Sequence, residues 1–191
     1  MARAAKKLHT LTLAQWADMD EDAEGELVDG VLEDEEMPTA LHEMIVMWFA
    51  TALAAWARRN GARVFGSELK IATGARTGRK PDMSVFSRDS LPPLDAVVVR
   101  TTPLLVIEVL SPRPRDQRRD RVDKLREYAR VGAHHYWLVD PQLRTIEMLR
   151  LKDKRYVVAT VATRGRVKPE GFSGLTLDLK DLWSLVGKEL L

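Results

Sequence analysis

The chain has 191 residues, of which 45% are hydrophobic and 30% are charged, so it is long enough for one domain with a sizeable core. It contains no cysteine, which excludes disulfides and thiolate metal sites and is compatible with a reducing cytoplasm. The formal net charge of +2 conceals an asymmetry, because residues 8–57 contain no Lys or Arg while the remainder is basic; a basic half suits a polyanion such as nucleic acid, unless the two halves neutralise each other in the fold.

The sequence shows neither of the two common membrane signals. The N-terminal segment MARAAKKLHT lacks the apolar stretch of a secretory signal. The longest apolar stretch, Met44–Ala57, is too short to span a bilayer and is better explained as a packed helix. We therefore expect a cytoplasmic protein that does not enter a membrane.

In chain order, the first third predicts a short helix, a hairpin and a long helix. The short helix is expected at Leu11–Ala17. The segment Glu26–Met37 alternates around Asp29-Gly30, which is a strong hairpin signal. The long helix is expected at about residues 40–60 and ends at Asn60-Gly61. Its apolar residues recur at helical spacing, so it should bury one face.

The next part of the chain predicts strands joined by a crossover helix. The expected strands are Arg63–Ala72, Pro81–Ser87, Leu104–Leu110 and His135–Pro141. A helix from Asp116 or a neighbour to about Val131 lies between the last two of them, and Gly132 ends it. A strand–helix–strand unit of this kind makes its two strands parallel.

The C-terminal part predicts a hairpin of residues 144–151 and 155–162, then a short strand and a terminal helix. Since hairpins are antiparallel and the crossover is parallel, we expect one central mixed sheet flanked by helices, of the α/β or α+β class. The sequence shows no repeat or linker. We therefore expect a single domain of residues 1–191, with a core of about residues 24–150 and a C-terminal extension of residues 151–191.

Two carboxylates stand in strands that are otherwise apolar. Asp82 follows Pro81 at the start of one strand, and Glu108 lies in the middle of the run LLVIEVL. If the two strands are neighbours, both carboxylates can converge at one point of the sheet, where they repel each other unless one keeps a proton or a cation bridges them. Oxygen ligands favour Mg²⁺ or Mn²⁺, and such an ion can activate a water for phosphodiester hydrolysis.

A lysine on the crossover helix is the third candidate for chemistry. On a helical wheel, Val122, Leu125 and Ala129 form the buried stripe, and Lys124 lies beside it, near Tyr128. A lysine at the edge of the core can reach a site at the strand ends. It could hold or deprotonate the attacking water, or bind a phosphate oxygen.

Each of these residues also has a structural explanation. Glu108 could form an ion pair with Lys124 or an arginine, and Asp82 could cap a turn. The basic run Arg113–Arg130 commonly means a solvated helix with ion pairs at i, i+4 spacing. The adjacent His134-His135 point to opposite faces of a strand, so they are not expected to bind one metal together.

The spacing of several motifs resembles the Uma-two family of bacterial proteins. In the run Ile107–Pro141, the motif E-V-L-S-P stands at residues 108–112 and the motif Y-W-L-V-D-P at residues 136–141. Between these motifs, the residues spaced by four are Asp120, Lys124, Tyr128 and Gly132. Further matches are Pro81-Asp82, the hairpin ELVDGVL and His42 in the long helix. The resemblance runs from about residue 10 to residue 185.

The resemblance implies a restriction-endonuclease-like fold of the PD-(D/E)xK type, with a central mixed sheet, an N-terminal β-hairpin and a C-terminal hairpin extension. It also implies that Asp82 and Glu108 are metal ligands, helped by the main-chain carbonyl of Val109, with Mg²⁺ or Mn²⁺ as the ion. Glu26 would be an auxiliary acid near the metal, and Lys124 would be the lysine of the nuclease core.

The function that follows is a metal-dependent endonuclease that hydrolyses phosphodiester bonds, first of all in DNA, and that works as a homodimer like many nucleases of this fold. The residues expected along the nucleic acid are Arg113, Arg115, Arg118, Arg119, Arg121 and His42. Two departures from the family pattern are Leu110, where the usual E-x-K motif has its lysine, and His135, where the family usually has Glu. They leave open an inactive nucleic-acid-binding or regulatory protein of the same fold, and a structural role with an inert ion pair.

Overall fold

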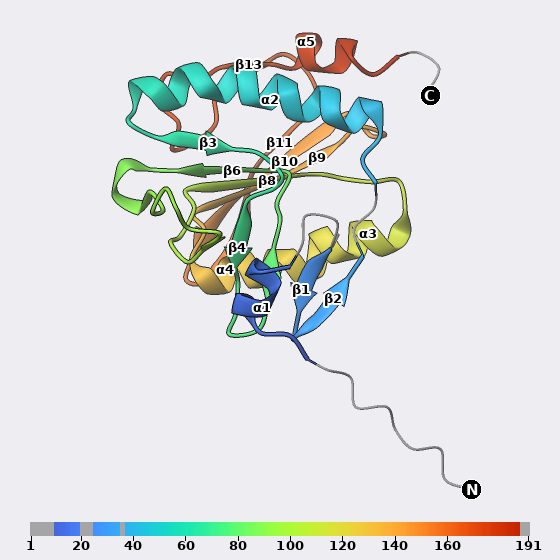
Figure 1. Cartoon of the computed structure of the whole chain (residues 1–191). Coiled ribbons are helices and arrows are strands. Elements are labelled where there is room, and N and C mark those ends of the chain that lie inside the picture. Colours follow the sequence, from blue (N-terminus) through green and yellow to red (C-terminus); the bar gives the residue numbers. More distant parts are fainter. Residues whose placement is uncertain (1–9, 20–24, 35–36, 188–191) are drawn as a thin grey trace, which may run out of the picture.

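The computed structural model describes residues 10–19, 25–34 and 37–187, and its centre is a six-stranded mixed sheet covered by helices on both faces (Figure 1). In spatial order, the strands of this large sheet are β11 (Arg155–Ala162), β10 (Thr145–Lys152), β9 (His135–Asp140), β8 (Leu105–Val109), β6 (Met83–Phe86) and β3 (Arg63–Phe65). The helices are α1 (Leu13–Ala17), α2 (Ala40–Arg59), α3 (Pro114–Arg118), α4 (Leu125–Val131) and α5 (Leu179–Ser184). A 3₁₀ turn covers Arg88–Ser90, and a π-helical segment, Arg119–Lys124, joins α3 to α4.

Two smaller sheets accompany the large one. In spatial order, the five-stranded sheet contains β2 (Val31–Glu33), β1 (Glu26–Val28), β5 (Gly78–Arg79), β4 (Lys70–Ala72) and β7 (Val98–Val99). The two-stranded sheet pairs β12 (Arg166–Val167) with β13 (Leu177–Asp178). Figure 1 shows α2 and α5 over one face of the large sheet, and α3, α4 and the β1–β2 hairpin on the other side.

The long helix α2 packs one face against the large sheet, as its apolar spacing predicts. Ile45, Phe49 and Leu53 are completely buried there. Trp56 is also buried, whereas Trp48 lies at the edge of the core and donates a hydrogen bond to Asp181. By length and composition, α2 is the one helix in the described ranges that could cross a bilayer, but a core helix passes the same test. Its three buried anchors favour the core helix.

The predicted hairpins and the crossover are confirmed. The turn at Asp29-Gly30 has φ values of 49° and 84°, which are the left-handed values that a tight two-residue hairpin turn requires. Residues 35–36, at the end of the predicted hairpin segment, lie outside the described residues. Strands β8 and β9 are parallel neighbours, and Gly132 ends the connecting helix at φ 85°. The C-terminal hairpin β10–β11 turns at Asp153-Lys154.

One prediction about the strands is wrong. The expected strand Arg63–Ala72 is two strands, because the chain turns at residues 66–69 and leaves the large sheet: β3 pairs with β6, whereas β4 pairs with β5 and β7. The expected central mixed sheet is confirmed, and a five-stranded sheet, whose strands are only two or three residues long, accompanies it. The extension expected at residues 151–191 begins inside β10, and its strand β11 forms one edge of the large sheet.

Candidate functional site

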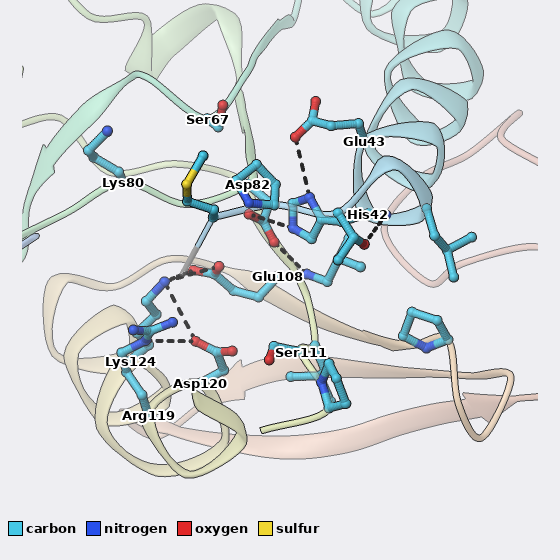
Figure 2. A pocket seen from close by; sticks show the side chains of 18 of the residues that line it. His42, Glu43, Ser67, Lys80, Asp82, Glu108, Ser111, Arg119, Asp120 and Lys124 are labelled. Atoms are coloured by element: carbon cyan, nitrogen blue, oxygen red, sulfur yellow. Dashed lines mark hydrogen bonds and ion pairs between the residues drawn. The ribbon is translucent and has the colours of Figure 1, made fainter. Parts of the chain in front are cut away.

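Neighbouring strands bring the two predicted carboxylates together. β6 is antiparallel to β8, with Met83 opposite Ile107, so one step further along the same register Asp82 lies opposite Glu108. Figure 2 shows both side chains among those that line one pocket. The main-chain N–H of Val109 donates a 2.6 Å hydrogen bond to Asp82 Oδ2, which fixes that carboxylate at the end of the pair.

Lys124 reaches Glu108 of β8 and Glu26 of β1 from the crossover helix. Its Nζ lies 3.1 Å from Glu108 Oε1 and 3.1 Å from Glu108 Oε2. It also lies 3.1 Å from Glu26 Oε1 and 3.6 Å from Asp120 Oδ1. The hydroxyl of Tyr128, four residues after Lys124, also donates to Glu108 Oε1 at 3.1 Å. The ammonium of Lys124 therefore stands among three carboxylates.

The π-helical segment explains how the crossover helix presents these side chains. The residues buried along it at intervals of four are Asp116, Asp120, Lys124 and Tyr128. Residues spaced by four drift around an α-helix, and a π-helical turn, which holds one extra residue, corrects that drift. The helical wheel therefore erred in placing Lys124 beside an apolar stripe, because Val122 and Leu125 are only half-buried while Lys124 is 4% exposed.

Glu26 belongs to β1 of the five-stranded sheet and connects Lys124 to Arg79. Its Oε2 accepts a 2.9 Å bond from Arg79 Nη1, and its Oε1 accepts one from the main-chain N–H of Lys80. Arg79 continues to Glu127 through Nε at 2.7 Å and Nη2 at 2.6 Å, and Glu127 also accepts a bond from the hydroxyl of Thr73. Sequence reasoning missed Arg79, Glu127 and Thr73, because nothing local indicates that residues about fifty positions apart will pair.

His42 enters the site from the first turn of α2. Its Nε2 lies 3.1 Å from Asp82 Oδ1, and its Nδ1 lies 3.4 Å from Glu43 Oε1 (Figure 2). Burial alone would lower the pKa of His42, but the contact with Asp82 outweighs it and the pKa is raised. The sequence placed His42 along the nucleic acid; the structure places it directly against Asp82.

The predicted nucleic-acid arginines are divided between different surfaces. Arg119 lies at the site and pairs with Asp116 at 3.3 Å. Arg121 points elsewhere, to Glu147 and Asp140. The remaining members are Arg113, which is exposed, and Arg115 and Arg118, which line a neighbouring groove.

These side chains line one cavity of about 420 Å³. Its polar wall contains His42, Lys80, Asp82, Glu108, Arg119, Asp120 and Lys124. The apolar residues that line the same cavity include Leu41, Leu110, Pro112 and Pro141. The cavity thus holds a group of carboxylates and cations together with apolar side chains.

The carboxylates carry more negative charge than Lys124 alone neutralises. Burial raises the pKa of Glu108 well above its usual value, and Asp82 and Asp120 add to that effect while Lys124 opposes it. Burial also raises the pKa of Asp120. The pKa of Glu26 is lowered instead, because the positive charges of Lys124 and Arg79 have a larger effect than burial. Burial would lower the pKa of Lys124, but the carboxylates around it raise it.

The donor set fits a hard divalent cation. In the described part of the chain no group of three or more His, Asp and Glu side chains forms a ready metal cluster. Mg²⁺, however, commonly takes only one or two carboxylates and keeps waters, and Asp82 and Glu108 supply two. Asp120 Oδ1 is buried and has no hydrogen-bond partner within the described ranges, although Lys124 and Arg119 each lie 3.6 Å from it, so a carboxylate oxygen without a hydrogen bond remains beside those two carboxylates.

Comparisons with known proteins identify the family and the fold of the chain. Residues 11–180 match the Uma2 family, which is described as "putative restriction endonuclease". A crystal structure of "a putative nuclease belonging to DUF820" from Anabaena variabilis ATCC 29413 is 24% identical, with a TM-score of 0.75 over 92% of this chain and 99% of that one. This likeness confirms the restriction-endonuclease-like fold. No curated protein matches the chain significantly. Because the family match covers most of the sequence, the chain belongs to the Uma2 family.

Proposed function

We propose that the protein is a metal-dependent endonuclease that hydrolyses phosphodiester bonds in DNA. The observation that carries the proposal is the ammonium of Lys124, which lies 3.1 Å from Glu108 in a cavity that Asp82, the strand neighbour of Glu108, also lines. Two carboxylates and one lysine at a strand end are the chemical groups that metal-assisted phosphodiester hydrolysis needs. The family to which the chain belongs supports the same reaction class.

The residues that would hold Mg²⁺ or Mn²⁺ are Asp82 and Glu108, with the main-chain carbonyl of Val109. When bound there, the ion would supply a nucleophilic water and neutralise charge on the reacting phosphate. The protein orients these ligands in advance: Asp82 is fixed between His42 and the N–H of Val109, and Glu108 accepts a hydrogen bond from Tyr128. Preorganised ligands of this kind need little rearrangement during the reaction.

Lys124 acts as a cation rather than as a base in this proposal. Its raised pKa keeps the ammonium protonated at neutral pH, so it donates hydrogen bonds and stabilises negative charge on a phosphate oxygen. Glu26 positions it, because Glu26 contacts Lys124 and is itself fixed by Arg79 and the N–H of Lys80. Arg119, at the edge of the cavity, supplies a second positive charge for the substrate.

The test is cleavage of supercoiled, linear and single-stranded DNA, and of RNA, with Mg²⁺, Mn²⁺ or EDTA. We expect metal-dependent cleavage of DNA that falls about 100-fold or more in Asp82→Asn, Glu108→Gln and Lys124→Met. The control is Glu170→Gln, which removes an equivalent charge at an exposed position and should cleave normally. Full cleavage by folded Asp82→Asn and Glu108→Gln proteins would contradict the proposal.

A second candidate is a nucleic-acid-binding or regulatory protein that keeps the fold without the reaction. Leu110 favours it, because it stands where the usual nuclease motif has a lysine and is buried at 4% exposure. That candidate predicts DNA binding without any metal-dependent product. The homodimer, the cytoplasmic location and the absence of membrane association remain parts of the proposal; light scattering of the purified protein and fractionation of cells test them.

A further inference from the structure

A second groove runs beside the candidate site along the crossover helix. It encloses about 380 Å³, and Val28, Asp29 and Glu33 of the β1–β2 hairpin form one side. The arginines that line it are Arg79, Arg115, Arg118, Arg119, Arg126 and Arg130. Arg119 lines both the groove and the cavity of the candidate site, so the two hollows adjoin.

Four of these arginines have no carboxylate partner within the described ranges, although acids surround them. All four are exposed and line the groove. They are Arg115, Arg118, Arg126 and Arg130. The acids nearest in sequence are engaged elsewhere: Asp116 pairs with Arg119, Asp120 lies near Lys124, and Glu127 binds Arg79. In an ordinary solvated helix, these arginines would form ion pairs with acids three or four residues away, and their charge would be neutralised. The four arginines of this helix differ because they lack such partners among the described residues.

The carboxylates inside the groove do not remove its positive character. Glu127 is neutralised by Arg79, and Asp29 accepts a hydrogen bond from Thr77. Glu33 and Asp123 also line the groove, but no ion pair joins either of them to the four arginines within the described residues. A guanidinium without a carboxylate partner is suited to bidentate contact with phosphate.

We propose that this groove binds the sugar–phosphate backbone of duplex DNA as it leads away from the site, an inference that rests on the proposed function. Arg115 and Arg130 are fifteen residues apart, about 22 Å along a helix, which matches the axial rise of about six base-pair steps of a duplex. Among the described residues that line the groove none is aromatic. Grooves for single strands typically stack bases on aromatic side chains, so the lining favours duplex backbone.

Binding of a labelled 20-base-pair duplex, measured by fluorescence anisotropy in EDTA at several salt concentrations, tests the inference without cleavage. The variant Arg126→Ala/Arg130→Ala should lower the slope of log affinity against log salt by about 1.8, so its defect should shrink about tenfold between 50 and 200 mM salt. The matched control is Arg58→Ala/Arg59→Ala, which removes the same charge at exposed positions at the end of α2. It should keep the slope and affinity of the wild type.

Three results would overturn the inference. They are an unchanged slope in the groove variant, an equal loss of affinity in the Arg58/Arg59 control, and, when a single strand of the same length is measured beside the duplex, a loss confined to that single strand. The proposed function is judged separately, by cleavage of a small phosphodiester such as bis(p-nitrophenyl) phosphate, which is too short to reach the groove. The groove variant should cleave it at the wild-type rate, whereas Asp82→Asn should not. A negative result for DNA binding in the groove therefore does not affect the proposed reaction. If the small phosphodiester is not cleaved, the binding experiment can still be interpreted.

Discussion

Removing the carboxylate of Glu127 should destabilise the protein far more than removing an exposed acid. Arg79 is 1% exposed, and it donates two of its three side-chain hydrogen bonds to Glu127. Glu127→Ala would leave these two donors and the hydroxyl of Thr73 without their acceptor. Only Glu26 would still balance the buried guanidinium.

The magnitude follows from the burial of the pair. Breaking a buried ion pair by removing one partner costs about 3–5 kcal/mol, because the other charge remains uncompensated. For a chain of this length, that loss corresponds to a fall in Tm of about 6–20 °C. The control is Glu170→Ala, whose side chain is 56% exposed and pairs with the exposed Arg150. An exposed pair contributes about 0–1 kcal/mol, so the control should remain close to the wild type.

Urea denaturation followed by circular dichroism measures these free energies of unfolding. The double variant Arg79→Met/Glu127→Leu removes both charges, so it should be more stable than the sum of the two single losses predicts. A loss below about 1 kcal/mol in Glu127→Ala would refute the reasoning, since it would mean that the pair is solvated. Strict additivity in the double variant would refute it too.

Two further predictions concern packing and pH. In Gly78→Ala, the new Cβ would lie 2.3 Å from the indole of the buried Trp16, so we expect a loss of about 1–3 kcal/mol in urea denaturation, whereas Gly66→Ala, with nothing within 4 Å of its Cβ, should change stability by less than about 0.5 kcal/mol. Equal effects of the two substitutions would contradict the packing argument. Burial against Phe172 lowers the pKa of His135 to about 4, so the unfolded chain takes up a proton first as the pH falls, and the contribution of His135 to stability should decrease by roughly 3 kcal/mol between about pH 6.5 and pH 4. His135→Gln should flatten that part of the pH profile, and an unchanged profile would show that His135 is not the group responsible.

Local signals explain what the sequence could predict of the fold. The helix α2 is predictable because a long apolar stripe follows a helical period, and the β1–β2 hairpin because Asp29-Gly30 can adopt left-handed φ values. The parallel pair β8–β9 follows from the strand–helix–strand order. In contrast, β5 and β7 have two residues each, too few for any period, and only pairing with distant strands defines them.

The candidate site also contains residues that the sequence could predict and residues that it could not. Asp82, Glu108 and Lys124 stand out in the sequence because each is a charged residue in an apolar or helical context, and the fold brings all three together. The pair of Arg79 and Glu127 could not be predicted, since its partners are 48 positions apart. The π-helical turn also leaves no simple sequence signal, because it changes the spacing by a single residue.

A lysine on a helix has a longer and more flexible route to a strand end than a lysine on the strand itself, so it needs external support. The structure provides that support as a closed chain of contacts: Lys124 contacts Glu26, Glu26 contacts Arg79, and Arg79 contacts Glu127. Glu127 lies on the same helix, three residues after the lysine. Along the register of β1 and β5, Leu27 faces Gly78, so Glu26 and Arg79 are direct neighbours across the small sheet. The strands β1 and β5 of the five-stranded sheet therefore contact both Lys124 and Glu127, which stand one helical turn apart. In this way the chain holds an ammonium against Glu108, although Leu110 occupies the strand position where the usual motif has its lysine.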